Sequence, residues 1–446
     1  MEMRGNLLAL LVLAAAAAVA SGNPARLELV PAAPGASVAE RARDDRHRHA
    51  YITDKLASRS GGGARRVAAE VAASAVSLPV SSGAYAGTGQ YFVKFLVGTP
   101  AREFTLVADT GSDLTWVMCQ GAGAGGASPL GHVFSPANSK SWKPILCPSD
   151  TCKLDVPFSL ANCSAPSSPC AYDYKYKEGA AGAKGVVGTE SATIALHGGK
   201  TAHLVDVVLG CSSSQGGQSF DASDGVLSLG NSKISFASLA ATRFGGSFSY
   251  CLVDHLAPRE ATGYLAFGPM PAVPRNPVAQ TPMLLDPEMP FYGVKVEAIV
   301  VGSQVLRIPA AVWDAAKGGG AILDSGTTLT VLATPAYRAV TAALSASLAG
   351  IPKVDFPPFE YCYNWTARRP GAPEIPTLSV HLAGSARLEP PAKSYVIDVK
   401  PGVKCIGVQE GEWPGVSVIG NIMQQEHVWE FDLKNRLVKF KQSTCT

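Results

Sequence analysis

The stretch FTLVADTGSDLTWV, residues 104–117, decides how this chain folds, because an apolar strand pattern leads directly into Asp-Thr-Gly-Ser. A second stretch, AILDSGTTLTVL at residues 321–332, repeats the order: an apolar strand, Asp-Ser-Gly-Thr, and a strand containing Leu-Thr. A Val-Gly pair precedes each stretch, at residues 97–98 and 301–302. A pattern that recurs once, about 215 residues apart, predicts two similar lobes with matching turns.

Each repeat places an aspartate at the end of a strand, before a hydroxyl residue, a glycine and a second hydroxyl residue. Glycine allows the tight turn that brings main-chain amides to the carboxylate, and the hydroxyls can donate hydrogen bonds to it. If the lobes meet so that Asp109 and Asp324 face each other, the two carboxylates share one proton. One can then take a proton from water while the other polarises a peptide carbonyl, so we expect neither a cofactor nor a metal.

The specificity of this signal lies in the pair of motifs. A single Asp-Thr-Gly is more typical of an ordinary turn in which the aspartate bonds its own main chain. Two such motifs after apolar strands, in equivalent repeat positions, favour a catalytic pair.

The rest of the chain indicates a mostly β protein rich in turns. Short segments with β-branched or aromatic residues, bounded by Gly and Pro, predict strands at residues 91–97, 104–108, 114–118, 205–209, 292–301 and 428–433. The best helical patterns are residues 235–244 and 334–348. Five prolines between residues 268 and 282 indicate a boundary between the lobes.

The N-terminal region has the features of segments that are removed. Arg4, the apolar run at residues 7–19 and the small residues 18–20 have the order of a secretory signal peptide. Residues 39–59 can form an amphipathic helix, and GGGARR at 61–66 is an exposed site for processing. The predicted organisation is signal peptide 1–20, propeptide 21–80, first lobe 81–268, linker 269–282 and second lobe 283–446.

Charge excludes some partners. The 446 residues carry a net charge of +3, but residues 1–80 hold 10 of the 38 Lys and Arg and 7 of the 35 Asp and Glu, which leaves 28 of each beyond residue 80. A formally neutral mature chain without a basic cluster argues against nucleic-acid binding. No later stretch is apolar enough for a membrane anchor. We expect a monomer in the secretory pathway, delivered outside the cell or to the vacuole.

On these residues the chain resembles the pepsin-like aspartic proteases, within them the plant nepenthesin-like group, whose branches include a chloroplast nucleoid DNA-binding protease. The resemblance covers about residue 82 to the C-terminus and includes GTGQYFVKFLVGTP, GGSFSYCL and VIGN. It implies a bilobal pepsin-like double β-barrel with the active cleft between lobes and a hairpin flap over the substrate. The implied activity is endopeptidase cleavage of proteins or peptides at acidic pH.

The resemblance also assigns roles to individual positions. Asp109 and Asp324 match the catalytic pair, and their motifs supply the catalytic support residues, which are Thr110, Gly111, Ser112, Ser325, Gly326 and Thr327. Tyr176 matches the flap tyrosine, and Trp116 matches the tryptophan that supports it. Alone, either aromatic is more typical of a half-buried strand residue.

Two departures from the family pattern concern the cleft. The flap usually reads Tyr-Gly-Asp-Gly-Ser, but here Lys177 and Ala180 replace the first glycine and the serine. Ser228 stands where the first lobe usually has glycine, whereas the second lobe keeps Gly420. Neither change removes a proton-transfer group, so we expect altered specificity or rate rather than inactivity.

Ten cysteines in a secreted chain indicate disulfides rather than a metal site, since their spacings do not match a zinc knuckle. Six belong to the first lobe and four to its end or the second lobe: Cys119, Cys147, Cys152, Cys163, Cys170 and Cys211, then Cys251, Cys362, Cys405 and Cys445. The resemblance implies a Cys362–Cys405 bridge and a cysteine-rich insert from Cys119 to Cys170. Spacing leaves the remaining pairs open, including a bridge from Cys251 to Cys445.

Asn162 and Asn364 begin sequons for N-glycosylation in a secreted protein. The basic propeptide prompts one hypothesis: it lies in the acidic cleft at neutral pH and leaves when carboxylates protonate, with cutting near Arg65 and Arg66. A solvated targeting or folding segment is an equally good interpretation. The rival function is a secreted binding protein with this fold but no catalysis, like the plant xylanase inhibitors, although those have damaged catalytic motifs.

Overall fold

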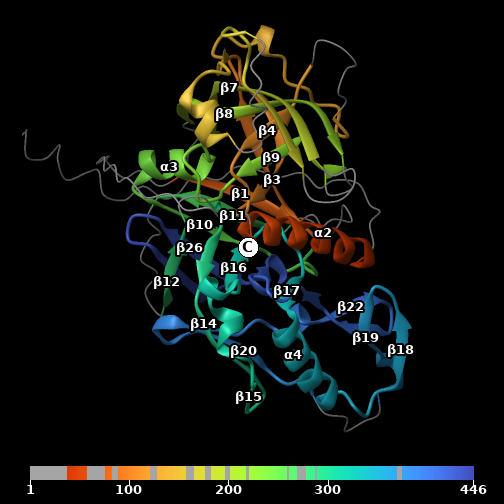
Figure 1. Ribbon diagram of the computed structural model, residues 1–446. Helices are drawn as coiled ribbons and strands as arrows, with labels where there is room; N and C mark the ends of the chain where they lie inside the picture. Colours follow the sequence, from red (N-terminus) through yellow and green to blue (C-terminus); the bar gives the residue numbers. More distant parts are fainter. Residues whose placement is uncertain are drawn as a thin grey trace, which may run out of the picture.

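The computed structural model describes residues 38–57, 76–82, 89–120, 128–156, 165–175, 182–195, 201–216, 220–258, 261–268, 278–286, 289–368 and 374–445. Several predicted features lie outside these residues: the signal peptide, Arg65 and Arg66, Asn162 with Cys163, and Tyr176, Lys177 and Ala180 of the flap. The described chain is mostly β-strand in two lobes, which confirms the predicted fold class (Figure 1).

The first lobe is built on antiparallel strands whose apolar residues turn inward. In β2 the sequence YFVKFLV buries its aromatic residues, and Phe95 packs edge-to-face on Phe236 of helix α3 with ring centroids 4.8 Å apart. The strands of this lobe are β2 Tyr91–Val97, β3 Arg102–Asp109, β4 Thr115–Met118, β5 Lys143–Pro144, β6 Ala171–Lys175, β7 Gly182–Ala195, β8 Thr201–Gly216 and β9 Gly225–Ser228. Helix α3, Phe236–Phe244, starts where Ser235 caps it.

The second lobe repeats the central part of this arrangement and adds two small sheets. Its strands are β13 Tyr292–Val294, β14 Val296–Val301, β15 Gln304–Val305, β16 Ala321–Asp324, β17 Thr330–Ala333, β18 Lys353–Phe356, β19 Phe359–Asn364, β20 Leu378–Leu382, β21 Ala386–Leu388, β22 Val396–Lys400, β23 Val403–Ile406, β24 Val408–Gly411 and β25 Ser417–Gly420. One added sheet has the order β15-β14-β20-β21 and the other β18-β19-β23-β22. Helix α4, Thr334–Ser347, buries Tyr337, Val340 and Leu344.

The repeat predicted from the two aspartate motifs is visible in the pairing of strands. In the first lobe β3 runs parallel to β9, with Asp109 opposite Ser228. In the second, β16 runs parallel to β25, with Asp324 opposite Gly420. Every residue of β9, β16 and β25 is buried, as expected for parallel strands covered on both faces. Each aspartate therefore sits at the end of a rigid central strand.

A sheet formed by both lobes joins them. Its strands are β1 Val76–Ser82, β10 Ser247–Cys251, β11 Thr262–Phe267, β12 Ala279–Leu285, β26 His427–Asp432 and β27 Leu437–Gln442. Strand β10 of the first lobe pairs with β26 of the second, and Phe248 stacks on Phe431 at 4.7 Å between ring centroids. This sheet therefore connects the two lobes through paired strands.

Two predicted domain limits fall within strands, and one predicted strand is wrong. The predicted propeptide end at residue 80 falls inside β1, where residues 76–81 pair in register with β11. The predicted linker, 269–282, overlaps β12, which starts at Ala279 and pairs with β27. The single strand predicted for residues 292–301 is two strands, since β13 pairs with β12 and β16 while β14 pairs with β15 and β20.

Helix α2, Val38–Ala57, comes from the segment predicted to be a propeptide helix. In Figure 1 it is the red helix that lies across the junction of the two lobes. It contacts β17 and β24 of the second lobe. Its position places residues upstream of the lobes next to the two aspartate motifs.

Candidate active site

The two aspartates lie at the centre of the molecule in matching environments. Asp109 and Asp324 are almost fully buried, at 1% and 0% exposure. The amide of Gly111 donates to Asp109 Oδ1 and that of Gly326 to Asp324 Oδ1, each at 2.9 Å. The hydroxyl of Ser112 donates to Asp109 Oδ2, and Thr327 Oγ1 donates to Asp324 Oδ2 at 2.5 Å. Each carboxylate is therefore oriented by its own motif.

The second residue of each motif connects the lobes. The Thr110 amide donates to Ser325 Oγ at 3.0 Å, and the Ser325 amide donates to Thr110 Oγ1 at 2.9 Å. Both hydroxyls also donate to main-chain oxygens of the opposite lobe, Ser325 to Ala108 at 2.8 Å and Thr110 to Leu323 at 3.4 Å. This buried exchange fixes the distance between the two carboxylates.

The departure at Ser228 is accommodated without disturbing Asp109. Its side chain is fully buried, lies 2.8 Å from Thr115 Oγ1 and accepts a hydrogen bond from the Phe236 amide at the start of α3. The equivalent Gly420 has no such room, because a Cβ there would lie 2.5 Å from the Leu329 carbonyl oxygen. The two lobes therefore differ at this equivalent position: the first has a buried, hydrogen-bonded serine, and the second has a glycine with no space for a side chain.

Arg48 of helix α2 covers both carboxylates. Its Nη2 lies 2.5 Å from Asp109 Oδ1 and 2.9 Å from Asp324 Oδ1, and its Nε donates to Asp324 Oδ2 at 2.6 Å. The guanidinium passes between the two motif glycines, since a Cβ on Gly111 or Gly326 would lie 2.5 or 2.6 Å from Nη2. One cation thus contacts both carboxylates at once.

Two neighbours of Arg48 on the same helix also bind the second lobe. The Asp45 carboxylate accepts hydrogen bonds from the amides of Thr328 and Leu329, each at 2.7 Å. His49 Nε2 lies 2.7 Å from the main-chain oxygen of Val416. These residues are spaced so that one face of α2 meets the cleft.

Burial and charge act differently on the two carboxyls. Burial raises the pKa of Asp109 above its ordinary value; Arg48 opposes this shift and Asp324 adds to it. Burial also acts to raise the pKa of Asp324. The positive charge of Arg48 and the hydrogen bonds from Arg48, Thr327 and the Gly326 amide outweigh this effect, so the pKa of that carboxyl is lowered. With Arg48 in place, the pKa of Asp109 is therefore raised and that of Asp324 is lowered.

The structure places only part of the expected flap support. Trp116 is 1% exposed and packs edge-to-face on Phe220, with ring centroids 5.2 Å apart. Its ring nitrogen has no hydrogen-bond partner within the described parts of the chain. Tyr176, to which it would donate by resemblance, lies outside them.

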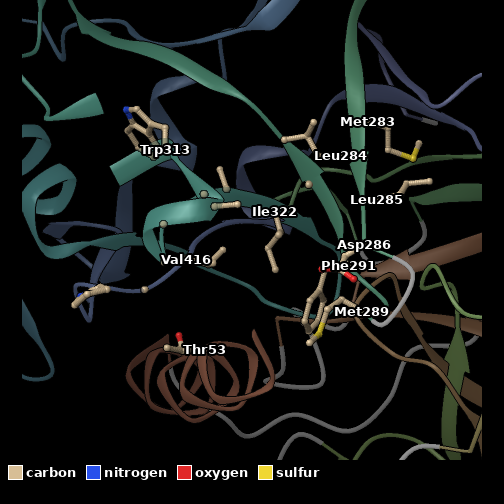
Figure 2. A pocket seen from close by; sticks show the side chains of 18 of the residues that line it. Thr53, Met283, Leu284, Leu285, Asp286, Met289, Phe291, Trp313, Ile322 and Val416 are labelled. Carbon is tan, nitrogen blue, oxygen red and sulfur yellow. The ribbon is translucent and has the colours of Figure 1, made fainter. Parts of the chain in front are cut away.

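An apolar cavity of about 640 Å³ lies beside the aspartate of the second lobe. Ile322, two residues before Asp324, lines it together with Met289 and Phe291. Figure 2 shows Thr53 of α2 at one side of this cavity and Trp313 at the other. The C-terminal part of helix α2, at Thr53, therefore borders a cavity large enough for a bulky apolar side chain.

The nine cysteines within the described residues are disulfide-bonded. The bridges are Cys119–Cys211, Cys152–Cys170, Cys251–Cys445 and Cys362–Cys405, and Cys147 is also oxidised. They include the pair implied by resemblance and the bridge between β10 and the C-terminus that spacing had left open. Cys163 lies outside the described residues.

Other predicted sites have simple local surroundings. Asn364 ends β19, and its side-chain oxygen accepts hydrogen bonds from the amide and hydroxyl of Thr366, at 3.2 and 2.6 Å. Within the described ranges, no cluster of His, Cys, Asp or Glu could hold a metal ion. No helix in those ranges is both long and apolar enough to cross a membrane.

Sequence reasoning missed several residues that build the site. Arg48, Asp45 and His49 were part of a predicted helix, but no pattern identified them individually. Asn421, in the VIGN motif, donates to the main-chain oxygens of Gly89 and Ser325, each at 2.9 Å. Gln424 donates to the Ile419 oxygen at 2.7 Å. The signal that pointed toward Arg48 was the surplus of basic residues before residue 80, which prompted the hypothesis that this segment lies on acidic groups of the cleft.

Comparisons with known proteins identify relatives of this chain. Family models described as xylanase inhibitor N-terminal and xylanase inhibitor C-terminal match residues 91–269 and 291–442. Aspartyl protease family protein 2 of Arabidopsis thaliana is 34% identical over 375 residues, which cover 83% of this chain and 74% of that protein. Aspartic proteinase nepenthesin-2 of Nepenthes gracilis is 29% identical over 365 residues, covering 81% of this chain and 79% of that one.

Solved structures share the fold at lower identity. The structure reported as edgp superposes with a TM-score of 0.66 at 21% identity and covers 84% of this chain and 96% of its own. Basic 7S globulin from soybean gives a TM-score of 0.63 at 20% identity, with 84% and 98% of the two chains covered. At such identities the likeness concerns the fold alone.

Proposed function

Because the chain belongs to the pepsin-like aspartic protease family and is related to the plant nepenthesins, we propose that it is an aspartic endopeptidase. The observation that carries the proposal is the pair of buried carboxylates, Asp109 and Asp324, close enough to share one guanidinium. We assign catalysis to this pair, and orientation of the pair to Thr110, Gly111, Ser112, Ser325, Gly326 and Thr327.

The proposed reaction needs only the two carboxyl groups and a water. With Arg48 gone, two buried carboxylates at this separation cannot both ionise easily, so the pair holds one proton. The ionised member takes a proton from water as the water oxygen bonds to the peptide carbon, and the protonated member donates to the carbonyl oxygen. Collapse of the tetrahedral intermediate breaks the C–N bond, with a proton passing to the leaving nitrogen.

The one-proton requirement gives an acidic working range. Above the higher apparent pKa both carboxylates are charged and no acid is present; below the lower one both are protonated and no base is present. We therefore expect activity in acid and none near neutrality.

We further infer that residues 21–80 are an inhibitory propeptide and that the enzyme is made as a zymogen. Support comes from α2, because Arg48 occupies the carboxylate pair. The apolar run at residues 7–19 and the disulfides favour synthesis in the secretory pathway, for delivery outside the cell or to the vacuole. Substrates are expected to be proteins or peptides, with no nucleic acid or membrane anchor involved and the protein a monomer.

A second candidate is a protein of this fold that binds without cutting, because the matching family models are described by xylanase inhibitors. Complete hydrogen bonding around Asp109 and Asp324 favours the enzyme. A xylanase inhibitor would have no need of an oriented carboxylate pair.

One experiment separates the two candidates. The processed protein is incubated with a peptide library between pH 3 and 6, alongside Asp109→Asn and the control Asp206→Asn, which alters an exposed residue on β8. Cleavage by the wild type and the control, lost in Asp109→Asn, supports the proposal and gives the specificity. Cleavage that survives in Asp109→Asn contradicts the mechanism, and a folded wild type that cuts nothing favours the binding protein.

A further inference from the structure

His49 is buried at the point where helix α2 meets the second lobe, one residue beyond the arginine on the carboxylate pair. The residue is 4% exposed, and its Nε2 hydrogen-bonds the Val416 main-chain oxygen at 2.7 Å. The ring fits closely on the end of β24, because a Cβ on Gly411 would lie 2.6 Å from its Cε1. This imidazole is therefore enclosed by the enzyme only while α2 is docked.

The surroundings of the ring favour its neutral form. A carbonyl accepts from Nε2–H, so the docked ring needs no second proton. Burial lowers the pKa of His49, while the hydrogen bond to Val416 and the charge of Glu412 act in the opposite direction. Two other charged groups lie on the elements that meet at the ring, and each has its own partner. The Glu410 carboxylate on β24 lies 3.7 Å from Arg338 Nε, and Arg48 on α2 forms ion pairs with Asp109 and Asp324.

A proton bound by His49 therefore weakens docking. The free helix exposes the imidazole and restores its ordinary pKa of about 6.5, so the released state binds the proton more readily than the docked state. Docking has its full stability above that pH and loses stability as the pH falls below it. Acidification thus pulls the equilibrium toward release.

The Arg48 ion pairs respond to acid over a lower range. When α2 leaves, the carboxylate pair takes up one proton, so the Arg48 contacts lose stability as the pH falls through the higher apparent pKa of the free pair. In the pepsin pair that value is about 4.7, which lies below the ordinary pKa of about 6.5 for histidine. His49 therefore responds to acid before the carboxylate pair does, and a helix held by Arg48 alone would need stronger acid to leave.

We propose that His49 is a proton sensor in α2 that loosens the helix from the cleft in mildly acidic solution, before the arginine–carboxylate contacts are lost. The inference rests on the proposed function only in treating α2 as inhibitory. Docking itself can be measured without any proteolysis.

The test uses pulsed hydrogen exchange on the intact, uncleaved chain from pH 7.5 to 4, with protection of residues 38–57 corrected for intrinsic exchange rates. Wild type is compared with His49→Gln, which keeps a donor for Val416 but cannot be charged. The control is His203→Gln, an exposed histidine on β8. Intact mass verifies that no chain has been cut during the pulse.

The wild type and the control should lose protection of α2 between pH 6.5 and 5. In His49→Gln the midpoint should fall by about one pH unit or more, because the glutamine binds no proton. An unchanged midpoint in a variant that is fully protected at pH 7.5 would overturn the proposal. Loss of peptide cleavage in every sample would count against the proposed enzyme but not against this result.

A second measurement covers the case in which His49→Gln does not dock at pH 7.5. Histidine-selective NMR then follows the titration of His49 in the wild-type chain and in a peptide of residues 38–57. A lower pKa in the docked chain supports the sensor, and an equal or higher pKa contradicts it.

Discussion

At the scale of single residues, the docked state depends on Arg48, whose one guanidinium satisfies two buried carboxylates. Sequence reasoning predicted both aspartates because their motifs are local and repeated. It could not single out Arg48, because α2 contains several basic residues and only docking decides which one meets the pair. The same holds for Asp45, whose partners are main-chain amides some 280 positions away.

Replacing Arg48 with methionine should release α2 from the cleft. Truncating one partner of a buried charged pair costs about 2–5 kcal/mol, so docking should weaken by about 30-fold or more. The uncleaved Arg48→Met chain should therefore hydrolyse a peptide at pH 5 faster than the uncleaved wild type. The matched control is Arg46→Met, on the exposed side of the same helix. Equal latency in both variants would contradict the role of Arg48.

The reciprocal hydrogen bonds between Thr110 and Ser325 should contribute to the stability of the fold and to the rate of catalysis. In Thr110→Val the Ser325 amide loses its buried acceptor, which should cost about 1–3 kcal/mol of unfolding free energy. Urea titration measures this loss, and a reduced kcat should accompany it because the carboxylates are less well positioned. A variant as stable as the wild type would show that the cross-lobe exchange contributes little.

At the scale of elements, most strands and both long helices of the lobes were predictable from periodicity and turn residues. The break between β13 and β14 was not, since the apolar pattern of residues 292–301 is continuous while the two halves pair in different sheets. The start of β12 within the proline-rich segment was missed for a similar reason. Pairing across the molecule, rather than local preference, sets these limits.

The strands beside the two aspartates should tolerate exchange of small residues to different degrees. Gly420→Ala on β25 would place its Cβ against the Leu329 oxygen and should cost about 3 kcal/mol, because the obstacle is main chain. Ser228→Gly on β9 should cost only about 1–2 kcal/mol, through the lost hydrogen bonds to Thr115 and to the start of α3. Thermal unfolding ranks the two. A milder effect at Gly420 would contradict the asymmetry between lobes.

The apolar cavity should select a bulky apolar side chain close to the cut. Leu284 lines it and is 49% exposed, so Leu284→Glu should fold normally and lower kcat/KM for peptides with leucine or phenylalanine there by about 10-fold. Val305→Glu, at a 62% exposed residue on β15, is the matched control. Profiles from a peptide library that are the same for both variants would exclude this cavity from substrate binding.

At the scale of the whole molecule, the cleft depends on the sheet and the disulfide that join the lobes. The internal repeat predicted the two lobes, and the strands of the shared sheet complete them. The repeat did not predict how the two lobes are connected, because the disulfide and the paired strands between them join residues that are far apart in the sequence. Cys251–Cys445 spans 194 positions and anchors the C-terminus beside β10.

Removing that bridge should loosen the whole molecule rather than the site alone. Loss of a disulfide that closes a long loop typically costs about 2–5 kcal/mol. The double variant Cys251→Ser, Cys445→Ser should therefore unfold at lower urea concentration, with the catalytic pH range unchanged. A shift in pH range without loss of stability would mean that the bridge acts on the carboxylates and not on the lobes.

The most direct test of the account is the pH profile of kcat/KM for the processed enzyme, measured for the wild type and for Asp324→Asn. We predict a bell-shaped profile with both limbs in acid, belonging to the Asp109 and Asp324 pair as a unit, and loss of nearly all activity in Asp324→Asn. A profile that rises toward neutral pH, or substantial cleavage by Asp324→Asn, would contradict a water activated by two carboxylates that share one proton.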